Sequence, residues 1–384
     1  ELEAVVVAGQ SILAGLPDPL ILLDGEARIV RANPAAEALF EGPLAGRDLF
    51  AVLRAPPVME AVDAVLGGGA GRVVEVFLPV PVERIFSVRV EPLSAPAADG
   101  TAALLTLHDL THVRRADRMR ADFVANASHE LHTPLSTLIG FIETLQGPAR
   151  DDAEARARFL AIMHDQATRM ARLVADLLSL SRIELNEHTA PATPVDVGKV
   201  LRGVVATLQL KAAARDMEIV LGVPPPGPEL ALRTPGDAAA LDALPPVLGD
   251  ADELAQVLQN LIDNAIKYGR AGTPVGIAAW VVPPAPARRL AGPALAVAVI
   301  DRGEGIPRPH LPRLTERFYR VDTARSRDLG GTGLGLAIVK HILNRHRGRL
   351  DIASVPGVGS AFTVYLPLAP GAPGDRRHKS DMAS

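Results

Sequence analysis

The sequence contains no cysteine among its 384 residues, which excludes disulfide bonds, thiolate metal sites and a cysteine nucleophile. Aromatic residues are scarce, at 3% of the chain, so a broad stacking surface for single-stranded nucleic acid is not expected. The 40 basic and 44 acidic side chains nearly cancel, which argues against nucleic-acid binding through bulk charge. Histidine is absent before His108, and this disfavours a histidine-ligated haem in the N-terminal region.

Long apolar runs are also missing. No stretch reaches the ~18 consecutive apolar residues that a membrane-spanning helix needs. The chain starts at Glu1 and shows no charged-then-apolar signal segment. Apolar residues still make up 48% of the chain, so we expect a folded, soluble portion of a longer protein, with two or three domains.

Residues 1–110 mix turn signals with short strand-like runs, which predicts an α+β domain with a five-stranded antiparallel sheet and small helices. The expected strands are 20–23, 27–32, 73–78, 85–90 and 102–107.

Residues 111–187 change to a heptad pattern of apolar positions. Two runs step by four and three residues: Leu131, Leu135, Leu138, Ile142 and Leu145, then Met163, Gln166, Met170, Leu173, Leu177 and Leu180. The turn at 147–152 between them predicts an antiparallel helical hairpin. Because a single hairpin leaves each apolar seam half covered, we expect a homodimer in which two hairpins close into a four-helix bundle.

Residues 188–370 predict a third domain of helices and strands, and residues 371–384 predict a disordered polar tail. A loop rich in Pro, Gly and Ala is expected at 224–246. The expected helices are 195–214, 251–268 with Asp250 as N-cap, and one from the glycine-rich stretch 328–335 to about 346. The expected strands are 274–282, 294–300, 349–354 and 361–366.

One candidate for chemistry is His129, which is followed by Glu130. His129 lies about 200° around the helix from the apolar Leu131, so its imidazole faces outward. A neutral imidazole is a competent nucleophile near neutral pH, and Glu130 can accept the proton of one ring nitrogen. An exposed His-Glu pair is also typical of a solvated helix surface, but Pro134 within the helix removes a backbone hydrogen bond and hints at function.

A second candidate is a polar face on the helix expected at 251–268. Asn260, Asn264, Lys267 and Tyr268 recur at helical spacing and share that face. Two amides, an ammonium group and a phenol could hold hydrated Mg²⁺ and a polyphosphate, or the face could simply be solvated.

Two glycine-containing motifs follow. Asp301 ends an apolar strand and precedes Gly303 and Gly305, so its carboxylate could accept from an exocyclic amine while the backbone approaches a ring. The glycines of 330–335 open a helix, where exposed backbone N–H groups bind phosphate oxygens. Neither the P-loop nor the Rossmann pattern fits, so this is a different kind of phosphate site, or else a flexible loop.

The order of five motifs, around His129, Asn260, Asp301, 316–320 and Gly331, resembles the sensor histidine kinase family over roughly residues 115–368. The resemblance implies a kinase that phosphorylates its own histidine from Mg-ATP and passes the phosphoryl group to an aspartate of a response-regulator receiver domain. It also implies phosphatase activity towards that regulator. The implied fold is a dimeric four-helix bundle followed by a Bergerat-type (GHKL) ATPase sandwich.

By this resemblance, His129 is the phosphoacceptor, Glu130 is its acid/base partner, and Thr133 helps to orient a water for dephosphorylation of the regulator. The family usually has arginine where this chain has His132. That difference puts regulator docking, or the balance between kinase and phosphatase, in doubt.

The resemblance also implies the nucleotide site. Asn264 is the Mg²⁺ ligand, with Asn260 beside it. Lys267 and Arg320 contact phosphate, and Asp301 accepts the adenine amine. The remaining implied nucleotide contacts are Tyr268, Gly303, Gly305, Ile306, Phe318, Gly331, Thr332, Gly333, Leu334, Gly335 and Leu336. The stretch between 306 and 331 is expected to be a mobile lid, with Phe318 as its apolar anchor.

Residues 8–110 resemble a PAS domain on the segments 16–24 and 32–37. The whole layout looks like the phosphate-regulon (PhoR) type of sensor kinase, which implies phosphate-starvation signalling. In that type, membrane helices precede the PAS domain, so we expect the cytoplasmic portion of an inner-membrane protein. The alternatives are a catalytically degenerate dimeric scaffold and another GHKL-type ATPase.

Overall fold

The computed structural model describes residues 13–78, 83–93, 97, 99–187, 189–222, 241, 243–284, 292–322 and 331–370, with only the backbone of two of them, Ala116 and Arg120. Most of the loop predicted at 224–246, part of the expected lid and the tail predicted at 371–384 lie outside these residues. The chain forms two compact units, Glu1–Ala125 and Asn126–Ser384, each of which is described by itself.

The first unit is built on a five-stranded antiparallel sheet, as predicted. Its strand order is β2-β1-β5-β4-β3, so consecutive strands form hairpins at both edges. The strands are β1 (Leu20–Leu23), β2 (Ile29–Ala32), β3 (Arg72–Leu78), β4 (Arg84–Pro92) and β5 (Ala103–Asp109). Three helices accompany the sheet: α2 (Pro34–Leu39), α3 (Leu49–Val52) and α4 (Pro56–Leu66).

Asn33 fixes the turn between β2 and α2. Its side-chain oxygen accepts from the N–H groups of Leu20 and Ala36, at 2.9 and 3.0 Å, and so caps the first turn of α2. Its amide donates to the carbonyls of Leu16 and Asp18. Because Asn33 is buried and all these bonds are made, its role in this motif is structural.

The helical hairpin consists of α5 (Thr111–Gln146) and α6 (Ala153–Asn186), joined by a short turn. Asp152 caps α6 by accepting from two backbone N–H groups of its first turn. In the single chain, Leu135 and Ile142 of the predicted seam are 46% and 41% exposed. The hairpin is therefore confirmed, and its apolar seam is only partly covered. Among the described residues, no helix combines the length and apolar character needed to cross a membrane.

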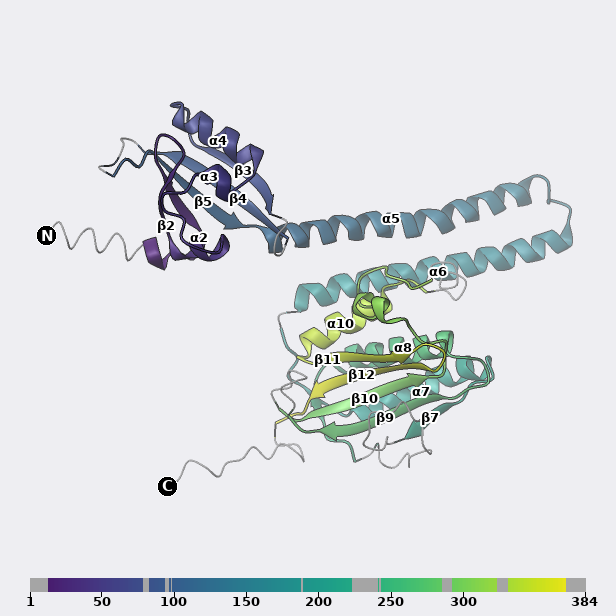
Figure 1. Ribbon diagram of the computed structural model, residues 1–384. Helices are drawn as coiled ribbons and strands as arrows, with labels where there is room; N and C mark the ends of the chain where they lie inside the picture. Colours follow the sequence, from purple (N-terminus) through teal and green to yellow (C-terminus); the bar gives the residue numbers. More distant parts are fainter. Residues whose placement is uncertain are drawn as a thin grey trace, which may run out of the picture. The chain divides into compact units, whose positions relative to one another are not determined.

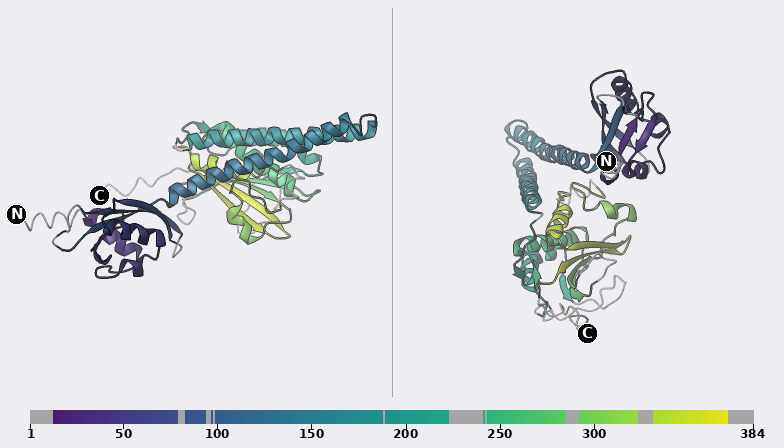
Figure 2. Two further views of the ribbon diagram at one scale, coloured as in Figure 1. Left: turned by 90° about the horizontal axis from the view of Figure 1, so that it is seen from above. Right: turned by 90° about the vertical axis from the view of Figure 1, so that its left-hand side faces the viewer.

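A second five-stranded sheet follows, with the order β11-β12-β10-β9-β7. It is antiparallel except for the parallel pair β7 and β9. Figures 1 and 2 show a layer of helices over one face of this sheet, which makes a two-layer sandwich. Its strands are β7 (Ile219–Gly222), β9 (Val275–Val282), β10 (Ala294–Asp301), β11 (Arg349–Val355) and β12 (Gly359–Pro367), and its helices are α7 (Val197–Ala213), α8 (Ala251–Tyr268) and α10 (Gly335–Arg345).

The helix predicted at 195–214 starts two residues later than expected. Pro194 and Val195 form a short strand, β6, which pairs with β8 (Val247–Leu248). Asp196 then caps α7 by accepting from the N–H of Lys199 at 3.0 Å. The early start was wrong because apolar periodicity does not distinguish a capping strand from a first helical turn.

His346 connects α10 to the start of α8. Its Nε2 accepts from the N–H of Asp250 at 3.0 Å, and its Nδ1 donates to the carbonyl of Ile342 at 2.8 Å. This pattern requires the neutral ring with a proton on Nδ1. Burial lowers the pKa of His346 below its ordinary value of 6.5.

The free energy of unfolding should therefore depend on His346. Because the unfolded chain binds a proton more readily than the folded one, the contribution of His346 is complete above about pH 6.5 and is lost as the pH falls from there through the lower folded-state pKa. We expect the wild-type melting temperature to fall between about pH 8 and pH 5. His346→Gln, whose side-chain oxygen can still accept from Asp250, should show a weaker fall. The exposed His164 provides the control variant His164→Gln, which should melt like the wild type at each pH.

Candidate functional site

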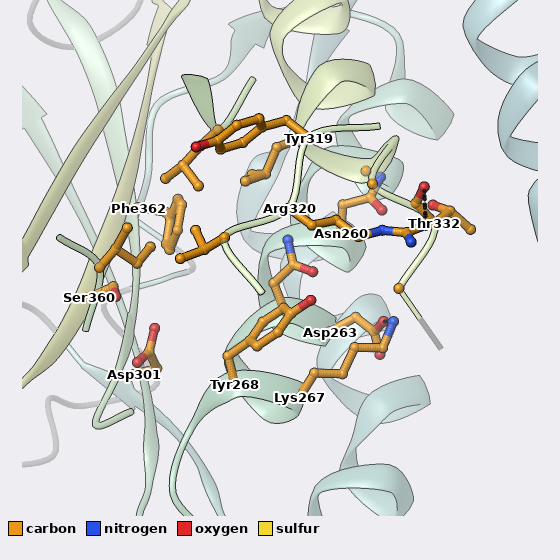
Figure 3. Close-up of a pocket in the computed structure, with 18 of the residues that line it drawn as sticks. Asn260, Asp263, Lys267, Tyr268, Asp301, Tyr319, Arg320, Thr332, Ser360 and Phe362 are labelled. Carbon is orange, nitrogen blue, oxygen red and sulfur yellow. Dashed lines mark hydrogen bonds and ion pairs between the residues drawn. The ribbon is translucent and has the colours of Figure 1, made fainter. Parts of the chain in front are cut away.

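A cavity of about 520 Å³ lies between α8, the end of β10 and the residues before α10. That size is typical of a site for a nucleotide-sized ligand. Figure 3 shows Asp301 and Ser360 towards one end of the cavity, and Lys267, Arg320 and Thr332 towards the other. The cavity therefore has a carboxylate at one end and basic groups at the other.

The polar face predicted on α8 lines this cavity. Asn260, Asn264, Lys267 and Tyr268 all contribute, whereas Leu261 and Ile262 are completely buried on the other side of the helix. The helix is placed by its caps, because Asp250 accepts from the N–H groups of its first turn and Gly269 follows its last.

Asp263 was not predicted and also lines the cavity. It pairs with Lys267 at 2.7 Å and with Lys211 of α7. Burial alone would raise the pKa of Asp263, but the two ammonium groups outweigh it and hold that pKa below its ordinary value. A phosphate that approaches Lys267 therefore meets an ammonium group whose charge is shared with Asp263.

Asp301 closes the opposite end. Its Oδ1 accepts from the N–H of Gly303 at 2.8 Å, and the carboxylate also accepts from the backbone of Ser360. Burial raises the pKa of Asp301, and these two hydrogen bonds only partly offset it. Gly303 must be glycine, since a Cβ there would collide with the carbonyl of Tyr268.

The segment before α10 completes the cavity with Gly331, Thr332 and Gly333. Gly333 has a φ of +74°, and a Cβ there would come within 2.9 Å of the backbone of Phe318. The N–H of Phe318 donates to the carbonyl of Gly333 at 2.8 Å, so the expected anchor of the lid is tied to the segment before α10. The cavity-facing start of α10 adds Gly335 and Leu336.

Arg320 joins the cavity to the helical hairpin. It lines the cavity, yet its Nη1 and Nη2 donate to the two carboxylate oxygens of Glu130 at 3.2 and 3.0 Å. Nη2 also donates to the carbonyl of Thr332 at 2.9 Å. Arg169 of α6 donates to Glu130 at 3.3 Å, so two guanidinium groups hold one carboxylate.

His129 itself is exposed on α5, as predicted, next to this ion-pair cluster. The hydroxyl of Thr133 donates to the carbonyl of His129 at 3.2 Å, one helical turn back. His132, which replaces the usual arginine, is exposed and lies 3.3 Å from the hydroxyl of Ser136 through its Nδ1.

Further contacts join α6 to the cavity region. The hydroxyl of Thr332 donates to Asp176 at 2.7 Å, and Asp176 with Arg172 extends the cavity wall. Burial raises the pKa of Asp176, an effect that the bond from Thr332 only partly offsets. Outside the cavity, Arg317 donates to Glu184 at 2.6 Å.

The structure thus brings most of the predicted nucleotide residues to one cavity. Those that line it are Asn260, Asn264, Lys267, Tyr268, Asp301, Gly305, Ile306, Arg320, Gly331, Thr332, Gly333, Gly335 and Leu336. Gly303, Phe318 and Leu334 are not in its lining and shape it through backbone contacts and packing. Lining residues that sequence reasoning missed include Arg172, Asp176, Asp263, Tyr319, Ser360 and Phe362. The i,i+4 spacing of Asp263 and Lys267 could have indicated Asp263.

Three protein families match this chain. Residues 249–370 match the "Histidine kinase-, DNA gyrase B-, and HSP90-like ATPase" family. Residues 119–186 match the "His Kinase A (phospho-acceptor) domain", and residues 13–115 match the "PAS fold".

Individual proteins are similar over longer stretches. The "Phosphate regulon sensor protein PhoR" of Pseudomonas aeruginosa is 35% identical over 98% of this chain and 78% of its own length. The "Sensor-like histidine kinase SenX3" of Mycobacterium bovis is 38% identical over 70% of this chain, which spans 59% of that relative. Among solved structures, full-length ShkA in complex with AMPPNP is 25% identical over 66% of this chain and 47% of its own, with a TM-score of 0.43.

Asp301→Asn tests the carboxylate end of the cavity. The substitution places an N–H donor where an oxygen now accepts, so a buried donor faces either Ser360 or an exocyclic amine of the ligand. We expect adenine-nucleotide affinity, measured by competition with a fluorescent analogue, to fall by about tenfold or more. Asp351→Asn, in β11 and outside the cavity lining, is the control and should bind normally. Equal affinity of Asp301→Asn and the wild type would exclude Asp301 from ligand binding.

Proposed function

This chain belongs to the PhoR-like sensor histidine kinases, ATP-dependent phosphotransferases of two-component signalling, and from that premise we propose that His129 is the residue it phosphorylates. The observation that carries the proposal is the double hydrogen bond from Arg320 to Glu130. Arg320 lines the cavity that fits ATP, and Glu130 is the neighbour of His129. The nucleotide site and the acceptor helix thus meet through one side-chain pair.

The reaction needs alignment and charge neutralisation more than covalent help from the protein. One ring nitrogen of neutral His129 attacks the γ-phosphorus of ATP. The N–P bond forms while the bond from phosphorus to the β–γ bridging oxygen breaks, and ADP leaves with that electron pair. The proton on the other ring nitrogen passes to the carboxylate of Glu130.

The cavity suits ATP with Mg²⁺. We assign adenine to the end at Asp301 and the phosphates to the end at Lys267, Arg320 and Gly331. The side-chain oxygens of Asn264 and Asn260 are hard ligands of the kind Mg²⁺ prefers, and these residues would hold the ion. When bound, Mg²⁺ supplies neutralisation of phosphate charge.

The remaining steps follow from the same proposal. Phosphohistidine at position 129 donates to an aspartate of a response-regulator receiver domain. Thr133 orients a water for the opposing phosphatase reaction, in which the regulator is dephosphorylated. The partly covered seam at Leu135 and Ile142 pairs with a second copy to form the four-helix bundle.

The similarity to PhoR over most of both chains supports a role in phosphate-starvation signalling. The same relative supports a cytoplasmic location for this portion of a sensor anchored in the inner membrane.

His129→Gln tests the acceptor. The variant should bind Mg-ATP like the wild type, because His129 is not part of the cavity lining, but it should lose acid-labile labelling from γ-³²P-ATP. His132→Gln, one turn of the chain away on the same exposed helix, should retain labelling. Persistent acid-labile label in His129→Gln would assign the acceptor elsewhere. Nucleotide binding without any labelling in the wild type would favour the scaffold alternative.

A mixing experiment tests whether the transfer occurs within one chain. Since Arg320 and Glu130 of the same chain are in contact, a mixture of His129→Gln and Asn264→Ala should stay unlabelled. Wild type mixed with tagged wild type shows whether subunits exchange under the same conditions. Labelling of the Asn264→Ala chain in the mixture would show instead that the site of one chain serves the histidine of another.

A further inference from the structure

The guanidinium group of Arg320 can bind either Glu130 or an anion in the cavity, but its N–H donors cannot fully satisfy both at once. Its side chain is 4% exposed, and it lies against Glu130 on one side and the nucleotide cavity on the other. Its Nη groups are engaged with Glu130 and Thr332, whereas its buried Nε has no hydrogen-bond acceptor among the described residues. A buried donor without an acceptor is costly, so this guanidinium group suits an additional anionic ligand.

The Glu130 carboxylate already has most of its hydrogen-bond acceptor positions filled. Its Oε2 accepts from both Arg320 and Arg169, and its Oε1 accepts from Arg320. A carboxylate oxygen has about two lone pairs, so Oε2 is saturated and Oε1 is half used. In this arrangement little of Glu130 is available to accept a proton from His129.

Resting on the function proposed above, we propose that Arg320 is exchanged between Glu130 and the nucleotide phosphate. Phosphate oxygens in the cavity compete with Glu130 for the same planar fork of N–H donors. When nucleotide takes Arg320, one acceptor position is released on each oxygen of Glu130. The acid/base group of the reaction thus becomes available when the phosphoryl donor is present.

Arg169 is the positioning residue in this exchange. It belongs to α6, donates to Glu130, and is not part of the cavity lining. After Arg320 moves to phosphate, Arg169 alone holds the Glu130 carboxylate beside His129. Without Arg169, the released carboxylate would be free to rotate into solvent.

The exchange has a measurable linkage. Because Glu130 competes with nucleotide for Arg320, removing the charge of Glu130 should strengthen nucleotide binding, even though it removes the acid/base group. We expect Glu130→Gln to bind the non-hydrolysable analogue Mg-AMPPNP about fivefold or more tightly than the wild type, by isothermal titration calorimetry on the full chain. In the background Arg320→Gln, the same change at Glu130 should have no effect on affinity.

A control separates exchange from general loosening of the hairpin contacts. Glu184→Gln breaks the ion pair between Arg317 and Glu184, which also joins α6 to the cavity region but does not line the cavity. Its AMPPNP affinity should match the wild type. Equal tightening in Glu184→Gln and Glu130→Gln would overturn the exchange, and so would unchanged affinity in Glu130→Gln.

A rate measurement tests the positioning role of Arg169. Arg169→Ala should lower the rate of His129 phosphorylation at saturating Mg-ATP by about tenfold with no rise in KM, and Arg169→Lys should recover part of the rate. Arg182→Ala, an exposed arginine of the same helix, is the control and should be unchanged. A wild-type rate in Arg169→Ala would exclude the positioning role. Failure of the wild type to bind AMPPNP or to label His129 would instead reject the function itself.

Discussion

The arrangement of the second unit depends on the ion pair between Arg320 and Glu130. It joins a residue of the cavity wall to the neighbour of His129, across 190 positions of sequence. Other contacts between the hairpin and the ATPase sandwich include the polar pairs Thr332 with Asp176, Arg317 with Glu184, and Ser179 with Gln256. The pair of Arg317 with Glu184 is partly exposed, and such pairs are individually weak. Arg320 is nearly buried, so its pair with Glu130 can break at little cost only when another anion takes the guanidinium group. Under the function proposed above, the catalytic region reaches His129 and then leaves it, and the nucleotide phosphate is the anion that takes Arg320.

Within the cavity, charge is arranged along its length. Asp263 forms ion pairs with Lys267 and Lys211 and so partly neutralises their charge. At the other end, the pKa of Asp301 is set by burial and backbone hydrogen bonds and not by a nearby cation. The raised pKa of Asp301 reflects burial, and the lowered pKa of Asp263 reflects its two lysines. One carboxylate is therefore suited to accept hydrogen bonds from a neutral ring, and the other to hold ammonium groups near phosphate.

Sequence periodicity and capping predicted most of the fold. The hairpin, α8 with its Asp250 cap, the strands of the first sheet and four of the five strands of the second were expected close to their observed bounds, whereas β7 was not predicted. The one displaced helix start, at Val197, shows the limit of periodicity where a strand runs directly into a cap.

The motif residues of the nucleotide site could be predicted from the sequence, but the contacts that join the site to the helical hairpin could not. Motif residues on α8 and after β10 identify themselves by type and spacing, because each lies on a single regular element. Asp176 and Arg172 carry no such signal, since they reach the cavity only through the docking of α6. The partners of Glu130 were likewise invisible, because ion pairs between distant segments depend on tertiary structure that periodicity does not encode.

The contact between Arg320 and Glu130 also bears on the order in which phosphorylation of the histidine and transfer from it can occur. Under the function proposed above, a receiver domain that collects a phosphoryl group from His129 must approach the α5 surface beside Glu130, where Arg320 now binds. Two bodies cannot occupy that surface together, so loading of the histidine and its unloading are mutually exclusive in time. Alternation of the two steps then needs no separate timing device, because steric exclusion at one helix face enforces it.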